Sequence, residues 1–214
     1  MTPRIIAING LIGAGKDTIA DHLVKHHGYV KLKYADKLKD SVSNIFNLDR
    51  ELLEGETPES REWREIPLPF WSGEMEKAIT PRYILQMFGT ECMRNGFYND
   101  IWIAFVKQTI LDNPETKYVI PDCRFINEAL MVKPMGGETW NVKRGDNPCW
   151  WPAAVALNLL NWDGVDLETN SFTDGTFNVH ASERGLAGYT FDHVFLNNST
   201  KLSLTAKVDK MMMR

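Results

Sequence analysis

Cysteine and excess positive charge are both scarce in this 214-residue sequence, and each shortage excludes a class of protein. The three cysteines, Cys92, Cys123 and Cys149, are widely spaced and form no C-x-x-C pair. They therefore offer no cysteine-based zinc site or disulfide framework, and they fit a reducing compartment. The formal net charge of −4 argues against a general coat for polymeric nucleic acid, because phosphate backbones require a basic surface. A local basic pocket for a small phosphorylated ligand is still allowed.

Long apolar runs are also missing. The most apolar segment, Trp151 to Leu160, is far shorter than the roughly 20 residues needed to cross a bilayer. The N-terminus has no charged start followed by an apolar stretch and a cleavage site, so no secretory signal is expected. We expect a cytoplasmic protein without a membrane partner.

What the sequence does contain is a regular alternation of strand-like and helix-like patterns. Five short apolar runs predict strands at Arg4–Asn9, Tyr29–Tyr34, Lys117–Pro121, Glu138–Lys143 and His193–Asn197. Amphipathic spacing predicts helices over Lys16–His27, Asp36–Phe46, Pro81–Arg94, Asn99–Leu111, Phe125–Val132 and Leu202–Met212. Strands that alternate with helices imply crossover connections, so we expect an α/β fold whose five-stranded parallel sheet is covered on both faces. Residues 1–214 are expected to form one domain.

Two stretches interrupt this alternation and are predicted to be inserts. Residues 47–80 are rich in charge, Pro and Trp, and indicate a helical or irregular region. Residues 145–179 contain the run CWWPAAVALNLLNW, which predicts a short helix that opens at Pro152, followed by a polar stretch. In nucleotide-binding folds such segments often cover ligands, so residues 145–179 are expected to be lid-like.

Residues 9–18, NGLIGAGKDT, contain the G-x-x-x-x-G-K pattern of a phosphate-binding loop. The pattern lies between the first predicted strand and an amphipathic helix. Glycines there let backbone N–H groups turn toward phosphate oxygens, and the helix N-terminus adds its positive end. Lys16 is expected to act on the β- and γ-phosphates of ATP; the alternative is a glycine turn beside a solvated lysine. The predicted ATP-binding residues are Gly10, Gly13, Ala14, Gly15, Lys16, Asp17 and Thr18.

Asp17 stands where the common pattern has Ser or Thr, whose hydroxyl holds magnesium. A carboxylate beside a triphosphate is repelled unless a cation lies between them, and Mg²⁺ prefers hard oxygen ligands. Asp17 is therefore predicted to hold Mg²⁺ directly or through water, while Thr18 donates to a phosphate oxygen. The alternative is that Asp17 only complements the helix N-terminus.

Two other groups of residues are interpreted as structural. His22, His26 and His27 share the first predicted helix and are interpreted as surface or packing residues rather than metal ligands. Trp150, Trp151 and Trp162 are interpreted as packing or lid residues rather than stacking platforms.

The segment GAGKDTIAD resembles the loop of the bacteriophage-type deoxynucleoside monophosphate kinases and, more distantly, that of animal-type phosphomevalonate kinases. The resemblance spans most of the chain, apart from residues 145–179. The matching segments are YADKLKDSV, TPRYILQMFGTECMR followed by DIW, VIPDCRFINEA, HASERGL and FDHVFLNN. One departure is Lys37, which replaces the family's proline in A-D-P-L-K.

The resemblance implies a nucleoside monophosphate kinase-like, three-layer P-loop fold with 47–80 in the acceptor-binding region. Asp122 would hold magnesium or its water, and Arg124 would bridge the donor and acceptor phosphates. The resemblance places the residues that bind the acceptor at Asp36, Lys39, Arg82, Arg94 and Glu183. The alternatives are a helix cap for Asp36, a solvated helix charge for Lys39 and a structural pair for Asp122 and Arg124. For Arg82 and Arg94 they are charges at a helix start and at a helix end.

The resemblance therefore implies that ATP, with Mg²⁺, phosphorylates a small-molecule deoxynucleoside 5′-monophosphate, in the host cytoplasm if a phage encodes the chain. A homodimer is compatible with it. No protein nucleophile is needed, because the acceptor phosphate is already ionised. The residues alone indicate only a small-molecule kinase that uses ATP and magnesium. The alternatives are a kinase for another phosphorylated acceptor, such as phosphomevalonate, and a non-catalytic nucleotide-binding protein.

Overall fold

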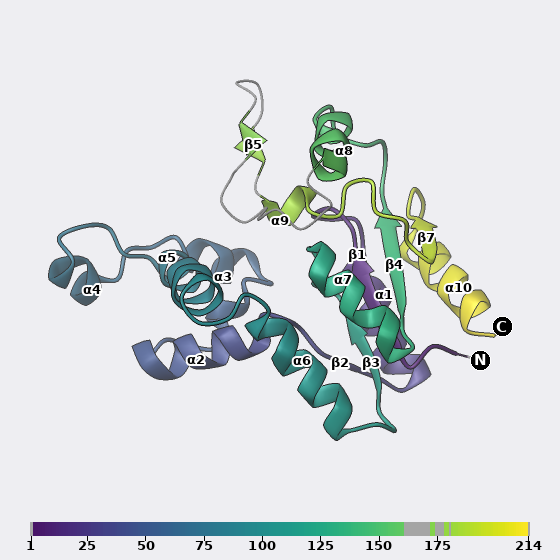
Figure 1. Cartoon of the computed structure of the whole chain (residues 1–214), viewed down its shortest axis with the longest axis horizontal. Coiled ribbons are helices and arrows are strands. Elements are labelled where there is room, and N and C mark those ends of the chain that lie inside the picture. Colours follow the sequence, from purple (N-terminus) through teal and green to yellow (C-terminus); the bar gives the residue numbers. More distant parts are fainter. Residues whose placement is uncertain (1, 161–171, 174–177, 180, 214) are drawn as a thin grey trace. The chain divides into compact units, whose positions relative to one another are not determined.

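The structure is a computed structural model that describes residues 2–160, 172–173, 178–179 and 181–213 (Figure 1). The chain divides into two compact units. We call Met1–Lys33 with Ile110–Arg214 the sheet unit, and Tyr34–Thr109 the helical unit.

The sheet unit contains five parallel strands in the order β2-β3-β1-β4-β7, which confirms the predicted sheet. The strands are β1 (Ile5–Asn9), β2 (Tyr29–Lys31), β3 (Lys117–Ile120), β4 (Glu138–Lys143) and β7 (His193–Leu196). They match the predicted strands to within a few residues at their ends. In the register, Ile6 of β1 lies between Val119 of β3 and Glu138 of β4.

Helices cover both faces of this sheet (Figure 1). Helices α1 (Lys16–His27) and α10 (Lys201–Met212) pack against each other on one face, and α7 (Ile126–Val132) lies on the other, against β1 and β4. Strand β1 is buried on both sides, as a central parallel strand should be. The core on the α1 and α10 side is built from Ile6, Ile8, Ile19, Leu23, Val119, Trp140, Phe195, Leu204 and Val208.

The order of the strands creates a switch point at β1. The chain crosses from β1 to β2 and β3 on one side, and then to β4 and β7 on the other. Ligands bind outside the carboxyl ends of the strands at such a point. Asn9, the last residue of β1, ties these ends together: its Nδ2 donates to the Cys123 carbonyl (2.9 Å), and its Oδ1 accepts from Asn141 (3.0 Å).

The helical unit has a hydrophobic core of its own. Its elements are α2 (Asp36–Phe46), η1 (Leu52–Glu54), α3 (Pro58–Trp63), α4 (Pro69–Glu74), α5 (Pro81–Gln86), η2 (Met87–Asn95) and most of α6 (Ile101–Asp112). The predicted insert 47–80 thus contains three short helices. Its Leu53 and Ile79 are fully buried with Val42 of α2 and Ile84 of α5, and Trp63 and Trp71 pack against them.

One predicted helix is wrong in part. The α-helix expected over Pro81–Arg94 ends at Gln86 and continues as the π-helix η2. This segment packs closely at Gly89. The Leu38 side chain leaves no room for a larger residue there, since a Cβ on Gly89 would lie 2.8 Å from a Leu38 methyl. The Gly89 carbonyl also accepts a hydrogen bond from the Trp102 indole (3.1 Å). Hydrophobic periodicity carries no signal for such a change of helix register.

The predicted insert 145–179 is described in part. Its apolar run forms α8 (Trp151–Leu160), which begins one residue before the expected Pro152. Phe172–Thr173 (β5) and Asn178–Val179 (β6) pair antiparallel, and α9 (Ala181–Arg184) follows. Residues 161–171 and 174–177, including Trp162, lie outside the described residues. The lid-like character of the insert stays a prediction.

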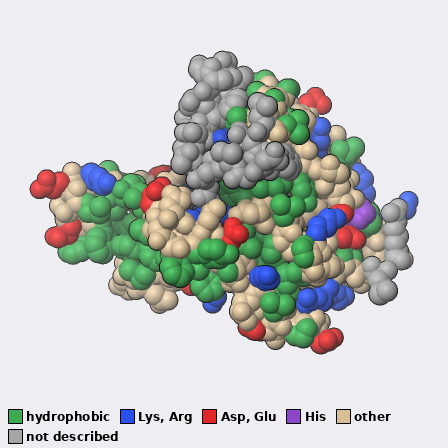
Figure 2. All heavy atoms as spheres, in the orientation of Figure 1, with side chains coloured by type: hydrophobic (Ala, Val, Ile, Leu, Met, Phe, Trp, Pro, Cys, Tyr) green, Lys and Arg blue, Asp and Glu red, His purple; other side chains and the backbone are tan. Residues whose placement is uncertain are grey.

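On the face drawn in Figure 2, acidic and basic side chains are interspersed, in keeping with the small net charge. Within the described residues, every helix is too short or too polar to span a bilayer.

Candidate active site

The loop that follows β1 has the backbone geometry of a phosphate-binding loop. Gly10, Gly13 and Gly15 all have positive φ, at 154°, 76° and 110°. Space as well as conformation requires glycine at two of them. A Cβ on Gly10 would lie 2.4 Å from the Val142 carbonyl oxygen, and one on Gly15 would lie 2.7 Å from Asn197 Nδ2.

Lys16 is the first residue of α1, and its side chain folds back over the loop. Its Nζ donates to the carbonyl oxygens of Gly10 (2.7 Å) and Leu11 (3.1 Å). The Lys16 ammonium therefore lies at the rim of the loop, where it can neutralise the charge of a phosphate.

The charges around Lys16 are those predicted for the site. Burial of the Lys16 ammonium lowers its pKa from the ordinary value of a lysine, and the Arg124 guanidinium lowers it further. The carboxylates of Asp17, Glu183 and Asp122 act in the opposite direction and raise that pKa. Four charged side chains therefore lie within electrostatic reach of Lys16, although the group comes from three separate parts of the sequence.

Arg124 lies in the turn after β3, and two carboxylates hold it. The Glu128 carboxylate accepts hydrogen bonds from the backbone N–H groups of Arg124 (2.7 Å) and Phe125 (3.0 Å), which fixes the turn before α7. The Arg124 guanidinium lies 3.3 Å from Glu183 and 3.4 Å from the Ser182 hydroxyl, both in α9. Since the Arg124 side chain is 43% exposed, it can also reach a ligand.

Two cavities border the loop. The first is lined by loop residues Asn9 to Ile12 with Lys16, and by Arg124, Trp151, Ser182, Glu183 and Leu186. The second, of about 250 Å³, begins at Leu11 and Ala14 and is walled by β4, the segment after it and aromatic residues Trp151, Tyr189 and Phe191. Trp151 and Leu11 line both. Charged side chains line both cavities: Lys16, Arg124 and Glu183 line the first, and Lys143, Arg144 and Asp146 line the second beside its aromatic residues.

Two carboxylates near Lys16 are candidate magnesium ligands. Asp17 is exposed in the first turn of α1, and Thr18 beside it is half-buried. Asp17 and Asp122 each lie close enough to the Lys16 ammonium to raise its pKa, and their carboxylates are hard oxygen donors of the kind that Mg²⁺ prefers. Asp17 also complements the positive end of α1, so both readings of this residue stay open.

The predicted acceptor residues Asp36 and Lys39 lie in the first turn of α2, in the helical unit. Lys39 is not the solvated helix charge of the alternative reading, because it is only 9% exposed and its Nζ lies 2.8 Å from Glu54. Arg50 bridges the same Glu54 and lies 3.5 Å from Asp36. Asp36 follows the N-cap Ala35, so it is not the helix cap either.

Arg82 and Arg94 also lie in the helical unit. Arg82 is the second residue of α5, and its Nε donates to Glu65. Arg94 lies near the end of η2 and donates to the Asn99 carbonyl (3.2 Å).

Sequence reasoning missed Arg64. Its Nε is buried, with no hydrogen-bond partner within the described part of the chain. Gly55 makes room for it, since a Cβ there would lie 2.1 Å from the guanidinium carbon. Burial lowers the pKa of Arg64, and the nearby Arg82 lowers it further, while Glu65, the ion-pair partner of Arg82, raises it. No sequence motif includes Arg64, so its burial and its proximity to Arg82 are seen only in the folded structure.

Comparison with known proteins identifies a relative and similar folds. No protein-family profile matches the chain. A protein of Acanthamoeba polyphaga mimivirus, described as "Putative deoxynucleotide monophosphate kinase", is 30% identical over 151 residues, which cover 65% of this chain and 74% of the relative. Two solved structures are similar in outline: TT1252 from Thermus thermophilus (TM-score 0.46, 16% identity, 100% of both chains) and shikimate kinase from Aquifex aeolicus (0.45, 11%, 98% of this chain and 96% of the other).

The match to the viral relative confirms the resemblance found in the sequence motifs, and the parallel sheet and the glycine loop agree with it. This chain belongs to the family of deoxynucleotide monophosphate kinases, which are phosphotransferases built on the P-loop fold.

Proposed function

We propose that this protein transfers the γ-phosphoryl group of ATP to a deoxynucleoside 5′-monophosphate, giving a deoxynucleoside diphosphate and ADP. The observation that carries the proposal is the group around Lys16: a glycine loop, an ammonium, a guanidinium and three carboxylates at the carboxyl ends of β1 and β3. The named activity of the viral relative supports the choice of acceptor.

In the proposed reaction an oxygen of the acceptor phosphate attacks the γ-phosphorus, and the bond from that phosphorus to the bridging oxygen of ADP breaks. The protein contributes position and positive charge rather than a nucleophile. Lys16 exchanges its two loop carbonyls for β- and γ-phosphate oxygens. Arg124, which Glu183 and Ser182 hold beside the loop, neutralises charge on the transferred group.

Magnesium, when bound, neutralises charge on the β- and γ-phosphate oxygens. Asp17 and Asp122 would hold it, directly or through water. The aromatic cavity lined by Trp151, Tyr189 and Phe191 would receive the base of ATP.

We assign acceptor binding to the helical unit, so that both units serve one kinase domain. Arg64 and Arg82 lie close enough to lower the pKa of Arg64, and an anion between two such cations relieves their repulsion. We infer that they bind the acceptor phosphate, with Arg94 as a third cation. Asp36 and Lys39 belong to an ion-pair network with Arg50 and Glu54 that would contact the acceptor's sugar or base.

An ADP-release assay across the four deoxynucleoside monophosphates and phosphomevalonate tests the proposal. We expect release with ATP and Mg²⁺ that depends on at least one deoxynucleoside monophosphate and is lost in Lys16→Ala. Release with phosphomevalonate alone would assign another acceptor. ATP binding without release for any acceptor would identify a non-catalytic nucleotide-binding protein.

A further inference from the structure

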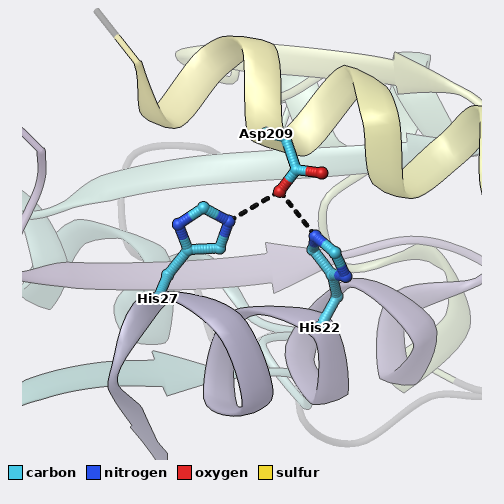
Figure 3. A group of neighbouring side chains, drawn as sticks. All are labelled: His22, His27 and Asp209. Atoms are coloured by element: carbon cyan, nitrogen blue, oxygen red, sulfur yellow. Dashed lines mark hydrogen bonds and ion pairs between the residues drawn. The ribbon is translucent and has the colours of Figure 1, made fainter.

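Three side chains from α1 and α10 converge at a place that the kinase reaction does not use (Figure 3). His22 and His27 project from α1, and Asp209 projects from α10 toward both of them. The Nε2 atoms of the two histidines each lie 2.7 Å from the same atom, Asp209 Oδ1. The three atoms all lie within 4.8 Å of one another.

The donor set is one that a divalent metal ion can use. Two imidazole nitrogens converge on one carboxylate oxygen, so three ligand atoms of the right chemical type lie together. Two histidines and a carboxylate are a common ligand set for Zn²⁺, at about 2.0–2.2 Å from the ion. Ligand atoms around a tetrahedral ion are roughly 3.3 Å apart at those lengths. The two nitrogen–oxygen separations of 2.7 Å would therefore open by less than about 1 Å to admit it.

The surroundings hold the ligands in place. The His22 and His27 side chains are 13% and 21% exposed, so packing of α1 against α10 restricts both rings. Asp209 is 38% exposed, which leaves one side of the group open to water as a fourth ligand.

We propose that His22, His27 and Asp209 form a binding site for a divalent transition-metal ion of the Zn²⁺ type. The earlier interpretation of these histidines as surface or packing residues would then be incomplete. The ion joins the second half of α1 to the second half of α10. Both helices support the phosphate-binding loop at their other ends: α1 begins with Lys16, and Asn197, just before α10, contacts the loop at Ala14. An ion that binds only the folded state stabilises it by mass action.

A metal titration without nucleotide tests this site separately from the magnesium of the reaction. Protein stripped with EDTA is titrated with Zn²⁺ by calorimetry, and with Co²⁺ while its visible absorption is recorded. Exposed Cys92 and Cys149 are alkylated first, because free thiols also bind these ions. We expect one equivalent to bind, a rise in melting temperature with Zn²⁺, and visible Co²⁺ bands of a four-coordinate site.

The variants His22→Gln, His27→Gln and Asp209→Asn should each lower the affinity for Zn²⁺ at least about tenfold, since even residues that support ligands cost this much. His26→Gln is the matched control, because His26 is exposed on the same helix and lies outside the three-residue group. Melting in EDTA shows whether each variant folds. The proposal is overturned if wild type binds no equivalent, or if His26→Gln weakens binding as much as His27→Gln. It is also overturned if Asp209→Asn lowers the melting temperature in EDTA while Zn²⁺ leaves that of wild type unchanged, which is the result expected of a hydrogen-bonded clamp alone.

Discussion

Asn197 donates a hydrogen bond from its Nδ2 to the carbonyl oxygen of Ala14, across 2.8 Å and 183 positions of sequence. The same amide group lies where a side chain on Gly15 would have to stand. The segment after β7 therefore restrains the phosphate-binding loop at Ala14 and Gly15. This gives a physical reason for the first of the two asparagines in the FDHVFLNN segment, which the sequence offered only as a resemblance.

Asn197→Ala should destabilise the fold and weaken ATP binding. A buried carbonyl that loses its donor costs about 1–3 kcal/mol, and a loop with one anchor fewer holds phosphates less well. Denaturant unfolding and an ATP titration measure both effects. Asn198→Ala is the control, because that side chain accepts from Gly145 and does not contact the loop. Equal effects of the two substitutions would contradict the special role of Asn197.

Lys16→Ala should abolish most turnover while the fold stays intact. Lys16 acts on phosphate charge and makes only hydrogen bonds to loop carbonyls, and removal of one such charge donor costs about 10²–10³ in rate. Steady-state kinetics measures the turnover, and circular dichroism shows whether the variant is folded. Lys25→Ala, in the last turn of the same helix, should behave as wild type. Near-normal turnover of a folded Lys16→Ala protein would show that this loop does not bind the phosphoryl donor.

Asp17→Asn should raise the Mg²⁺ concentration that gives half-maximal rate, with part of the loss recovered at high metal, because an amide oxygen is a weaker, uncharged ligand. Asp17→Ser should retain more activity than Asp17→Ala, since its hydroxyl is the usual ligand at this position. A helix-start carboxylate would instead cost about 0.3–1 kcal/mol of stability and leave the magnesium midpoint unchanged. Magnesium titrations of the three variants beside their melting curves separate these roles.

Arg82→Lys keeps the charge but loses the two-pronged geometry of guanidinium, so the KM for the acceptor should rise with ATP binding little changed. Arg61→Lys is the control, because Arg61 is exposed and its side chain donates to the Glu56 carbonyl rather than to Glu65. Equal weakening of ATP and acceptor would place Arg82 at the donor side. An unchanged KM for the acceptor would mean that Arg82 is only a charged residue at the start of α5.

Asp192→Asn should reduce stability near neutral pH and make no difference in acid. Burial alone would raise the pKa of Asp192, but hydrogen bonds from Lys133 and from Thr139 outweigh it and hold that pKa below its ordinary value. A carboxyl with a depressed folded pKa stabilises the fold above its unfolded pKa, and this contribution is lost as the pH falls through the folded value. Hydrogen bonds to a charged group are worth about 1.5–3 kcal/mol, which sets the scale of the loss. The unfolding free energies of wild type and Asp192→Asn should converge as the pH falls from 7 to 3. A difference that stays constant over this range would mean that the substitution acts through packing rather than through the charge of Asp192.

Much of the sheet unit could be predicted from local signals. The strands have period-two or wholly apolar patterns, and the loop combines glycines with a lysine between a strand and a helix, so their types and order follow from the chain alone. The adjacency of Lys16, Asp122 and Arg124 also follows once a parallel sheet is assumed, because carboxyl ends of neighbouring strands meet at one edge.

Other features depended on contacts between distant residues. The π-helix at Met87–Asn95, the orphan donor of Arg64 and the pairing of Lys39 with Glu54 carry no periodic signal, because side-chain packing within the helical unit produces them. The sequence by itself determined the fold class, the phosphate-binding loop and the family, since these depend on short stretches whose residues are neighbours in the chain. Only the tertiary structure decided that Asn197 anchors Ala14 and that His22 and His27 meet Asp209, because each of these contacts joins segments more than 180 residues apart, and packing alone brings them within hydrogen-bond distance.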